Sequence, residues 1–110
     1  MASLSGPFTA GISGITTTSS TSYTLSAADN GTIINFTSGS AITLNTVSGL
    51  GANFACTIVQ NGAGQITFVA GSGTTISSYA SATKTSGQYA VTTLFAPVAN
   101  AFILAGNVGV

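Results

Sequence analysis

The sequence has almost no ionic side chains. Charged residues make up 2% of its 110 residues, against about 25% in a typical soluble domain. The only formally charged side chains are Asp29 and Lys84, and the chain contains no Glu, Arg, His or Trp. Because one lysine cannot neutralise several phosphates, the composition argues against nucleic-acid binding by counterion release and against a polybasic site for membrane surfaces.

The same shortage bears on catalysis and on metal binding. General acid–base catalysis needs positioned titratable groups, and the chain offers one carboxylate and no imidazole. Cys56 and Asp29 cannot supply the three or four ligands of a metal site built from His, Cys and carboxylates. Calcium held mainly by backbone and Asn oxygens stays open, although no motif supports it. We therefore expect a protein that is not an enzyme, with no catalytic residues, no cofactor and no metal.

The chain also lacks a second cysteine, a signal peptide and a long apolar run. Cys56 cannot form an internal disulfide, and its apolar neighbours predict a buried thiol, with an intermolecular bridge or a reactive thiol as alternatives. Residues 1–7 have neither a basic nor an apolar region of the kind that begins a signal peptide. The most apolar stretch, residues 94–106, is interrupted by Pro97 and Asn100 and is too short to span a bilayer.

Uncharged polar residues take the place of the missing ionic ones. The chain has 15 serines and 18 threonines, and its formal net charge at pH 7 is zero. A protein of this kind has little charge repulsion to keep its copies apart. We therefore expect its working state to be a homo-oligomer.

What the sequence does contain is a series of short apolar alternations separated by turn residues. Residues 54–70 predict a central hairpin, in which the glycines of Asn61-Gly62-Ala63-Gly64 supply positive φ. The first strand of this hairpin is apolar on both faces, which is typical of a strand covered on both sides. Further strands are predicted at residues 23–25, 32–37, 41–45, 74–79, 88–96 and 101–105. The pattern indicates an all-β fold, an antiparallel β-sandwich or small jelly-roll-like barrel of seven or eight short strands.

The N-terminal residues differ from the rest of the chain. Residues 1–20 are rich in Gly, Ser and Thr, with Phe8, Ile12 and Ile15 as spaced apolar residues. We divide the chain into an N-terminal arm, residues 1–20, and a β-domain, residues 21–110. The arm is either a tail without fixed structure or an extended segment that docks Phe8, Ile12 and Ile15 onto a neighbouring subunit.

Four sequence motifs lie within residues 23–106. They are Tyr23-x-Leu25-x-x-x-Asp29-Asn30-Gly31-x-x-Ile34-x-Phe36, Cys56-x-x-Val59-Gln60-x-Gly62-x-Gly64-x-Ile66-x-Phe68, Lys84-Thr85-x-Gly87-Gln88-Tyr89 and Phe102-Ile103-Leu104-x-Gly106. Together they resemble a small β module of tailed-bacteriophage virion proteins, found in tail fibres, head fibres and capsid decoration proteins. Such modules often carry a Trp where this chain has Phe102. The motif residues are turn glycines and core positions, so the resemblance implies a fold and a virion context and transfers no ligand-binding residue.

The resemblance implies a structural protein of the virion. Because the chain begins with Met1 and has little outside the module, we expect a capsid decoration (cement) protein, made in the host cytoplasm. It would bind the outer surface of the capsid as a homotrimer and stabilise contacts between subunits of the major capsid protein.

Two other functions stay open. One is a tail-fibre or head-fibre domain that binds host-surface glycans, with an exposed aromatic such as Tyr79 or Tyr23 stacked on a sugar ring, while Tyr89 is expected to face the sheet or the core. The other is a self-assembling or ice-binding β protein, which the Thr and Ser content suggests although the sequence shows no fixed period.

Overall fold

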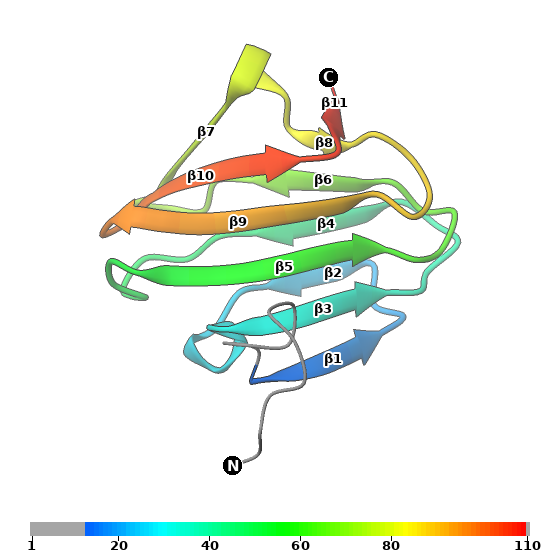
Figure 1. Ribbon diagram of the computed structural model, residues 1–110, viewed down its shortest axis with the longest axis horizontal. Coiled ribbons are helices and arrows are strands. Elements are labelled where there is room, and N and C mark those ends of the chain that lie inside the picture. The colour runs from blue at the N-terminus through cyan, green and yellow to red at the C-terminus, as the bar shows by residue number, and fades with distance from the viewer. Residues whose placement is uncertain (1–12, 110) are drawn as a thin grey trace, which may run out of the picture.

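The chain folds into two stacked β-sheets. The computed structural model describes residues 13–109, and Figure 1 shows the sheets as a front and a rear layer. The front sheet has the order β1 (Gly14–Thr18), β3 (Thr32–Phe36), β5 (Phe54–Gln60), β9 (Val91–Val98), β10 (Ala101–Gly106) and β7 (Thr75–Ser78). The rear sheet has the order β11 (Val108–Gly109), β8 (Lys84–Thr85), β6 (Ile66–Val69), β4 (Ile42–Asn45) and β2 (Ser22–Thr24). Two single-turn 3₁₀ helices, η1 (Ala27–Asp29) and η2 (Tyr79–Ser81), lie in the connections.

The all-β prediction is confirmed, but the predicted pairing is wrong for half of the fold. From β1 to β6 successive strands alternate between the two sheets, so that each consecutive pair forms a β-arch, and the arches stack in parallel. Antiparallel pairing is confined to β5–β9, β9–β10, β6–β8 and β8–β11. Residues 13–109 thus contain eleven strands in two mixed sheets, instead of seven or eight antiparallel strands.

The predicted central hairpin does not exist. β5 and β6 belong to different sheets, so the turn between them closes an arch. Gly62 and Gly64 in this turn have no positive φ. They are needed for a different reason, because a Cβ on Gly64 would lie 1.9 Å from the carbonyl oxygen of Ser40. The turn packs directly on the backbone of the preceding arch, which leaves no room for a side chain.

The core lies between the two sheets and matches the predicted facing of the strands. Alternate residues of β5 are buried, as are Ile66 and Phe68 on β6. Val47 and Leu50, in the loop before β5, pack against the edge of this core. The members of the core cluster are Leu25, Ile34, Phe36, Ile42, Leu44, Phe54, Cys56, Ile58, Ile66, Phe68, Leu94, Ala96, Phe102 and Leu104.

The first of the four motifs makes structural contacts within one corner of the fold. The carboxylate of Asp29 is buried and accepts hydrogen bonds from the Tyr23 hydroxyl at 2.8 Å and from the Ser26 amide at 2.9 Å. The Tyr23 ring packs edge-on against Phe36. Gly31 has φ +77°, as the predicted turn requires.

The second and third motifs meet at a buried hydrogen-bond network between the sheets. The Thr85 hydroxyl, on β8, donates to Oε1 of Gln60, on β5, and accepts from the backbone amide of Ile66 at 2.9 Å. Gln60 and Thr85 are both fully buried. The Gln60 carbonyl also accepts from the amide of Tyr89 at 2.6 Å. These motif residues therefore hold the two sheets together.

Part of the predicted arm belongs to the sheet. Gly14–Thr18 form β1 at the edge of the front sheet, in parallel register with Thr32–Phe36. One segment of the predicted arm is therefore an edge strand, for which its threonines and single isoleucine are suited. Phe8 and Ile12 lie outside the described residues.

Candidate interaction site

The outer face of the rear sheet is polar. Its residues follow from the strand registers and from the alternation of buried and accessible positions. They are Ser22, Thr24, Thr43, Asn45, Thr67, Val69 and Lys84. Five of these seven carry a hydroxyl or amide and one an ammonium group, so this face is suited to contact with water.

The outer face of the front sheet has the opposite character. Its apolar residues come from five strands, with hydroxyls and one amide between them. They are Ile15, Ile33, Ala55, Val59, Val91, Phe95, Ala101, Ile103 and Ala105, of which Ile33 is buried. Ile15 is 66% exposed, Val91 44% and Ile103 36%. Among the described residues no charged side chain lies on this face, which we call the apolar face.

The sequence pattern of β5 indicates part of this face. β5 was predicted to be covered on both sides because both of its faces are apolar. In the structure Ala55, Thr57 and Val59 are half-buried, and no second layer formed by residues 13–109 covers them. An apolar sheet face without a covering layer is typical of a surface that meets another molecule.

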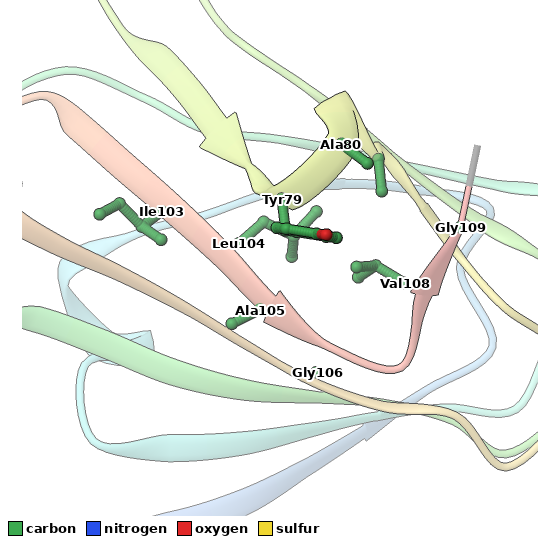
Figure 2. Close-up of a pocket in the computed structure, with 9 residues that line it drawn as sticks. Tyr79, Ala80, Ile103, Leu104, Ala105, Gly106, Val108 and Gly109 are labelled. Atoms are coloured by element: carbon green, nitrogen blue, oxygen red, sulfur yellow. The ribbon is translucent and has the colours of Figure 1, made fainter.

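A hollow of about 590 Å³ opens at one edge of the front sheet. It lies where the chain leaves β10 to form β11 in the rear sheet, and η2 borders it on the other side (Figure 2). The residues that line it are Tyr79, Ala80, Ala82, Ile103, Leu104, Ala105, Gly106, Val108 and Gly109. Every side chain in this lining is apolar except for the Tyr79 hydroxyl.

The strand β10 is open beside this hollow. β7 pairs with β10 only as far as Leu104, where β7 ends at Ser78 and the chain turns into η2. Ala105 and Gly106 therefore have no strand of the described residues on that side. Gly106 has φ +110°, and a Cβ there would lie 2.6 Å from the carbonyl oxygen of Val91. Glycine is thus required where the chain passes from one sheet to the other.

Tyr79 projects from a strained loop at the rim of the hollow. It is 92% exposed, and Figure 2 shows its side chain pointing from η2 toward β10. Ala80 and Ser81 both have φ +57°, a left-handed conformation that costs non-glycine residues of the order of 1 kcal/mol each. The Ser78 hydroxyl donates to the Ala82 carbonyl and closes the loop.

The structure describes two of the four residues that the sequence proposed as sites, and it places them at opposite edges of the front sheet. Ile15 lies on β1 at one edge of the front sheet, and Tyr79 lies beside β7 at the other. Phe8 and Ile12 lie outside the described residues. The hollow itself was missed, because it is formed by segments that are distant in the sequence and carry no shared motif.

The other two tyrosines differ from expectation. Tyr23 is half-buried, and its burial, reinforced by the hydrogen bond to Asp29, raises the pKa of its hydroxyl to about 12. It is therefore not free to stack on a ligand. Tyr89 is 69% exposed, so the expectation that it faces the sheet or core is wrong. Its φ of +70° places it in the turn before β9 and turns its side chain out of the sheet.

The thiol of Cys56 is buried, as predicted. Burial, and to a smaller extent the charge of Asp29, raises its pKa to about 12. The thiol therefore stays protonated near neutral pH and is a poor nucleophile. Within residues 13–109 no three His, Cys, Asp or Glu side chains gather as a metal site would require.

Neither the helices nor the comparisons with known proteins add a further site. Over the part of the chain that the structure describes, no helix has the length and apolar character needed to cross a membrane. The chain matches no protein-family model, no curated protein and no solved structure.

Proposed function

We propose that this protein is a structural protein of the bacteriophage virion, a decoration protein that binds the outer surface of the capsid as a homo-oligomer. It stabilises contacts between subunits of the major capsid protein, and a trimer is the expected oligomer. The resemblance of the four motifs supplies the virion context and the finer fold, a β-sandwich module with an N-terminal arm. The single observation that supports an assembled state is the apolar, uncharged outer face of the front sheet.

The two outer faces differ in chemical character, and this difference favours an assembled state. Both belong to the same small fold, yet one carries hydroxyls, amides and Lys84, and the other carries isoleucine, valine, phenylalanine and alanine. Burial of apolar surface gains about 25 cal/mol per Å², and it needs no complementary charges. Contacts made in this way are weakened little by salt, because there is no ion pair to screen.

The apolar face is smaller than the surface that a stable interface buries on each partner. Six strands that are spaced about 4.8 Å apart and average about six residues present roughly 550 Å² in projection. A stable interface buries about 800 Å² on each partner. The face alone is therefore too small for a lasting assembly, and the proposal requires a second contact between the copies or with the capsid.

The test introduces one charge on either face. Val91→Lys places an ammonium group on the apolar face, and Thr43→Lys places the same group on the polar face as a matched control. We expect the native protein and Thr43→Lys to be oligomeric at low and at high salt, and Val91→Lys to dissociate, as measured by size-exclusion chromatography with light scattering. A native protein that is a stable monomer at both salt concentrations would refute the proposal.

A second candidate, a fibre domain that binds host-surface glycans, is favoured by one observation. Tyr79 is almost fully exposed beside an open hollow, as a sugar-stacking residue must be. Against it, the lining offers no polar side chain besides the Tyr79 hydroxyl to bind sugar hydroxyls. Glycan binding that is lost in Tyr79→Ala and kept in the control Tyr89→Ala, which removes another exposed tyrosine, would support this function. Absence of binding at millimolar glycan would dismiss it.

A further inference from the structure

The hollow beside β10 has the features of a site for an extended peptide. The open end of β10 offers a strand edge at Ala105 and Gly106, and peptides commonly bind by adding a strand to such an edge. Leu104, Val108 and the alanines provide an apolar surface next to it. The volume of about 590 Å³ is within the range of pockets that enclose an organic ligand, about 300–1,000 Å³.

The lining selects the chemistry of the ligand. A charged ligand would find no counter-charge, and a sugar would find one hydroxyl. A peptide with a large apolar side chain would bury that side chain against Leu104 and Val108 and satisfy its backbone on the edge of β10. Tyr79, at the rim, is positioned to pack against an inserted aromatic ring, since aromatic pairs prefer edge-on or offset contact.

The chain itself contains a segment of this kind. Residues 1–12 include Leu4, Phe8 and Ile12 and no charged side chain. Pro7 disfavours the helical conformation at the residue before it, which favours an extended chain there. An uncharged segment that combines small residues with spaced apolar side chains matches an uncharged apolar hollow beside a strand edge.

The length of this segment determines whether it can bind to its own copy or to a neighbouring copy. The Ser13 amide is fixed by a 2.7 Å hydrogen bond to the Gly31 carbonyl, beside β1. A strand added next to β10 would stand five strand positions from β1, about 24 Å away. Five fully extended residues span at most about 18 Å, so Phe8 cannot bring its backbone beside β10 of its own copy.

We propose that residues 1–12 of one copy bind along the open end of β10 in a neighbouring copy, with the Phe8 side chain in the hollow next to Tyr79. This inference rests on the proposed function, and it supplies the second contact that the apolar face requires. It is a heterologous contact, in which one surface of each copy meets a different surface of the next. Such contacts close into rings when the rotation permits, which agrees with a cyclic trimer.

Disulfide trapping between different chains tests the inference on the full-length protein. One chain carries Phe8→Cys and a second chain carries Ala105→Cys, which is an exposed position on the wall of the hollow. The control pairs Phe8→Cys with Thr43→Cys on the polar face of the rear sheet. Cys56 stays in place because its thiol is buried.

Equimolar chains are mixed, oxidised mildly and separated by mass. We expect the first pair to form a species of twice the 10.7 kDa chain mass that contains one chain of each kind, and the control pair to remain at the mass of one chain. A third sample, the single-chain double variant Phe8→Cys/Ala105→Cys, is oxidised at high dilution and is expected to form no internal disulfide.

The outcomes separate this inference from the proposed function. No mixed species, an equal yield from the control pair, or an internal disulfide in the diluted double variant would each overturn the docking of residues 1–12 in a neighbour. If the native protein is still an oligomer in light scattering, the proposed function stands while this inference falls. A monomeric native protein would remove both.

Discussion

The hydroxyl of Thr85 lies at a point where the two sheets are joined, and its removal gives the sharpest test of the structure. Thr85 is on β8 of the rear sheet and is fully buried. Its hydroxyl donates to Oε1 of Gln60 on β5 of the front sheet and accepts from the amide of Ile66 on β6. The substitution Thr85→Val replaces the hydroxyl with a methyl group of similar volume, so it creates no cavity.

The expected cost follows from the two partners left behind. In Thr85→Val the backbone amide of Ile66 and the side-chain Oε1 of Gln60 each stay buried and lose their hydrogen bond to the Thr85 hydroxyl. Each buried group left without a partner costs about 1–3 kcal/mol. We therefore expect Thr85→Val to lower the free energy of unfolding by about 3 kcal/mol. At about 4 °C per kcal/mol for a domain of this size, the melting temperature should fall by about 12 °C.

Thr92→Val is the matched control for this prediction. Thr92 is as buried as Thr85, but among the described residues its hydroxyl makes a single hydrogen bond, 3.5 Å long, to the Ile58 carbonyl. Its substitution should cost less than about 1 kcal/mol. Urea unfolding followed by far-UV circular dichroism measures both variants. If Thr85→Val were within about 0.5 kcal/mol of the native protein, or no less stable than Thr92→Val, the network between the sheets would be refuted.

Two further predictions concern packing and pH. Gly64→Ala should destabilise the fold by more than about 2 kcal/mol, because the added Cβ would lie 1.9 Å from the Ser40 carbonyl oxygen. The control is Gly39→Ala, whose added Cβ has no neighbour within 4 Å. Equal melting temperatures of the two variants would contradict the close packing of successive turns. Folding raises the pKa of Cys56 from 9.0 and of Tyr23 from 10.0 to about 12. Their contribution to stability is therefore complete below pH 9 and is lost as the pH rises toward 12. Urea midpoints at pH 8, 10 and 12 measure this loss, which should be smaller in Tyr23→Phe; a midpoint unchanged up to pH 12 would show that neither group is buried as described.

The sequence predicted which residues are buried better than it predicted which strands are neighbours. Period-2 alternation assigned Ile34, Ile42 and Phe68 to the core, where the structure places them. It could not distinguish a hairpin from an arch, because β5 and β6 would alternate in the same way in either arrangement. Gly62 and Gly64 deepened the error, since glycine marks both a positive φ and a close approach of two backbones.

The candidate site was harder to predict than the core. The exposure of Tyr79 depends on the left-handed conformation of Ala80 and Ser81. Alanine and serine rarely adopt this conformation, so the sequence did not predict it. The hollow depends on the length of β7 relative to β10, which only the assembled sheet reveals. The apolar face was partly visible as a second apolar side on β5. The virion role, the capsid partner and the docking arm stay predictions.

The stacked arches have a consequence for how such a chain can change over evolutionary time. Gly14 lies beside Thr32 and Ile42 lies beside Ile66, at offsets of 18 and 24 residues. Each arch adds one strand to each of the two sheets and contacts mainly the arch before it. Because the spacings are unequal, an ancestral duplication would leave no regular repeat in the sequence. Gain or loss of one arch at the β1 end would change the width of both sheets while leaving the opposite edge, with its hollow, intact.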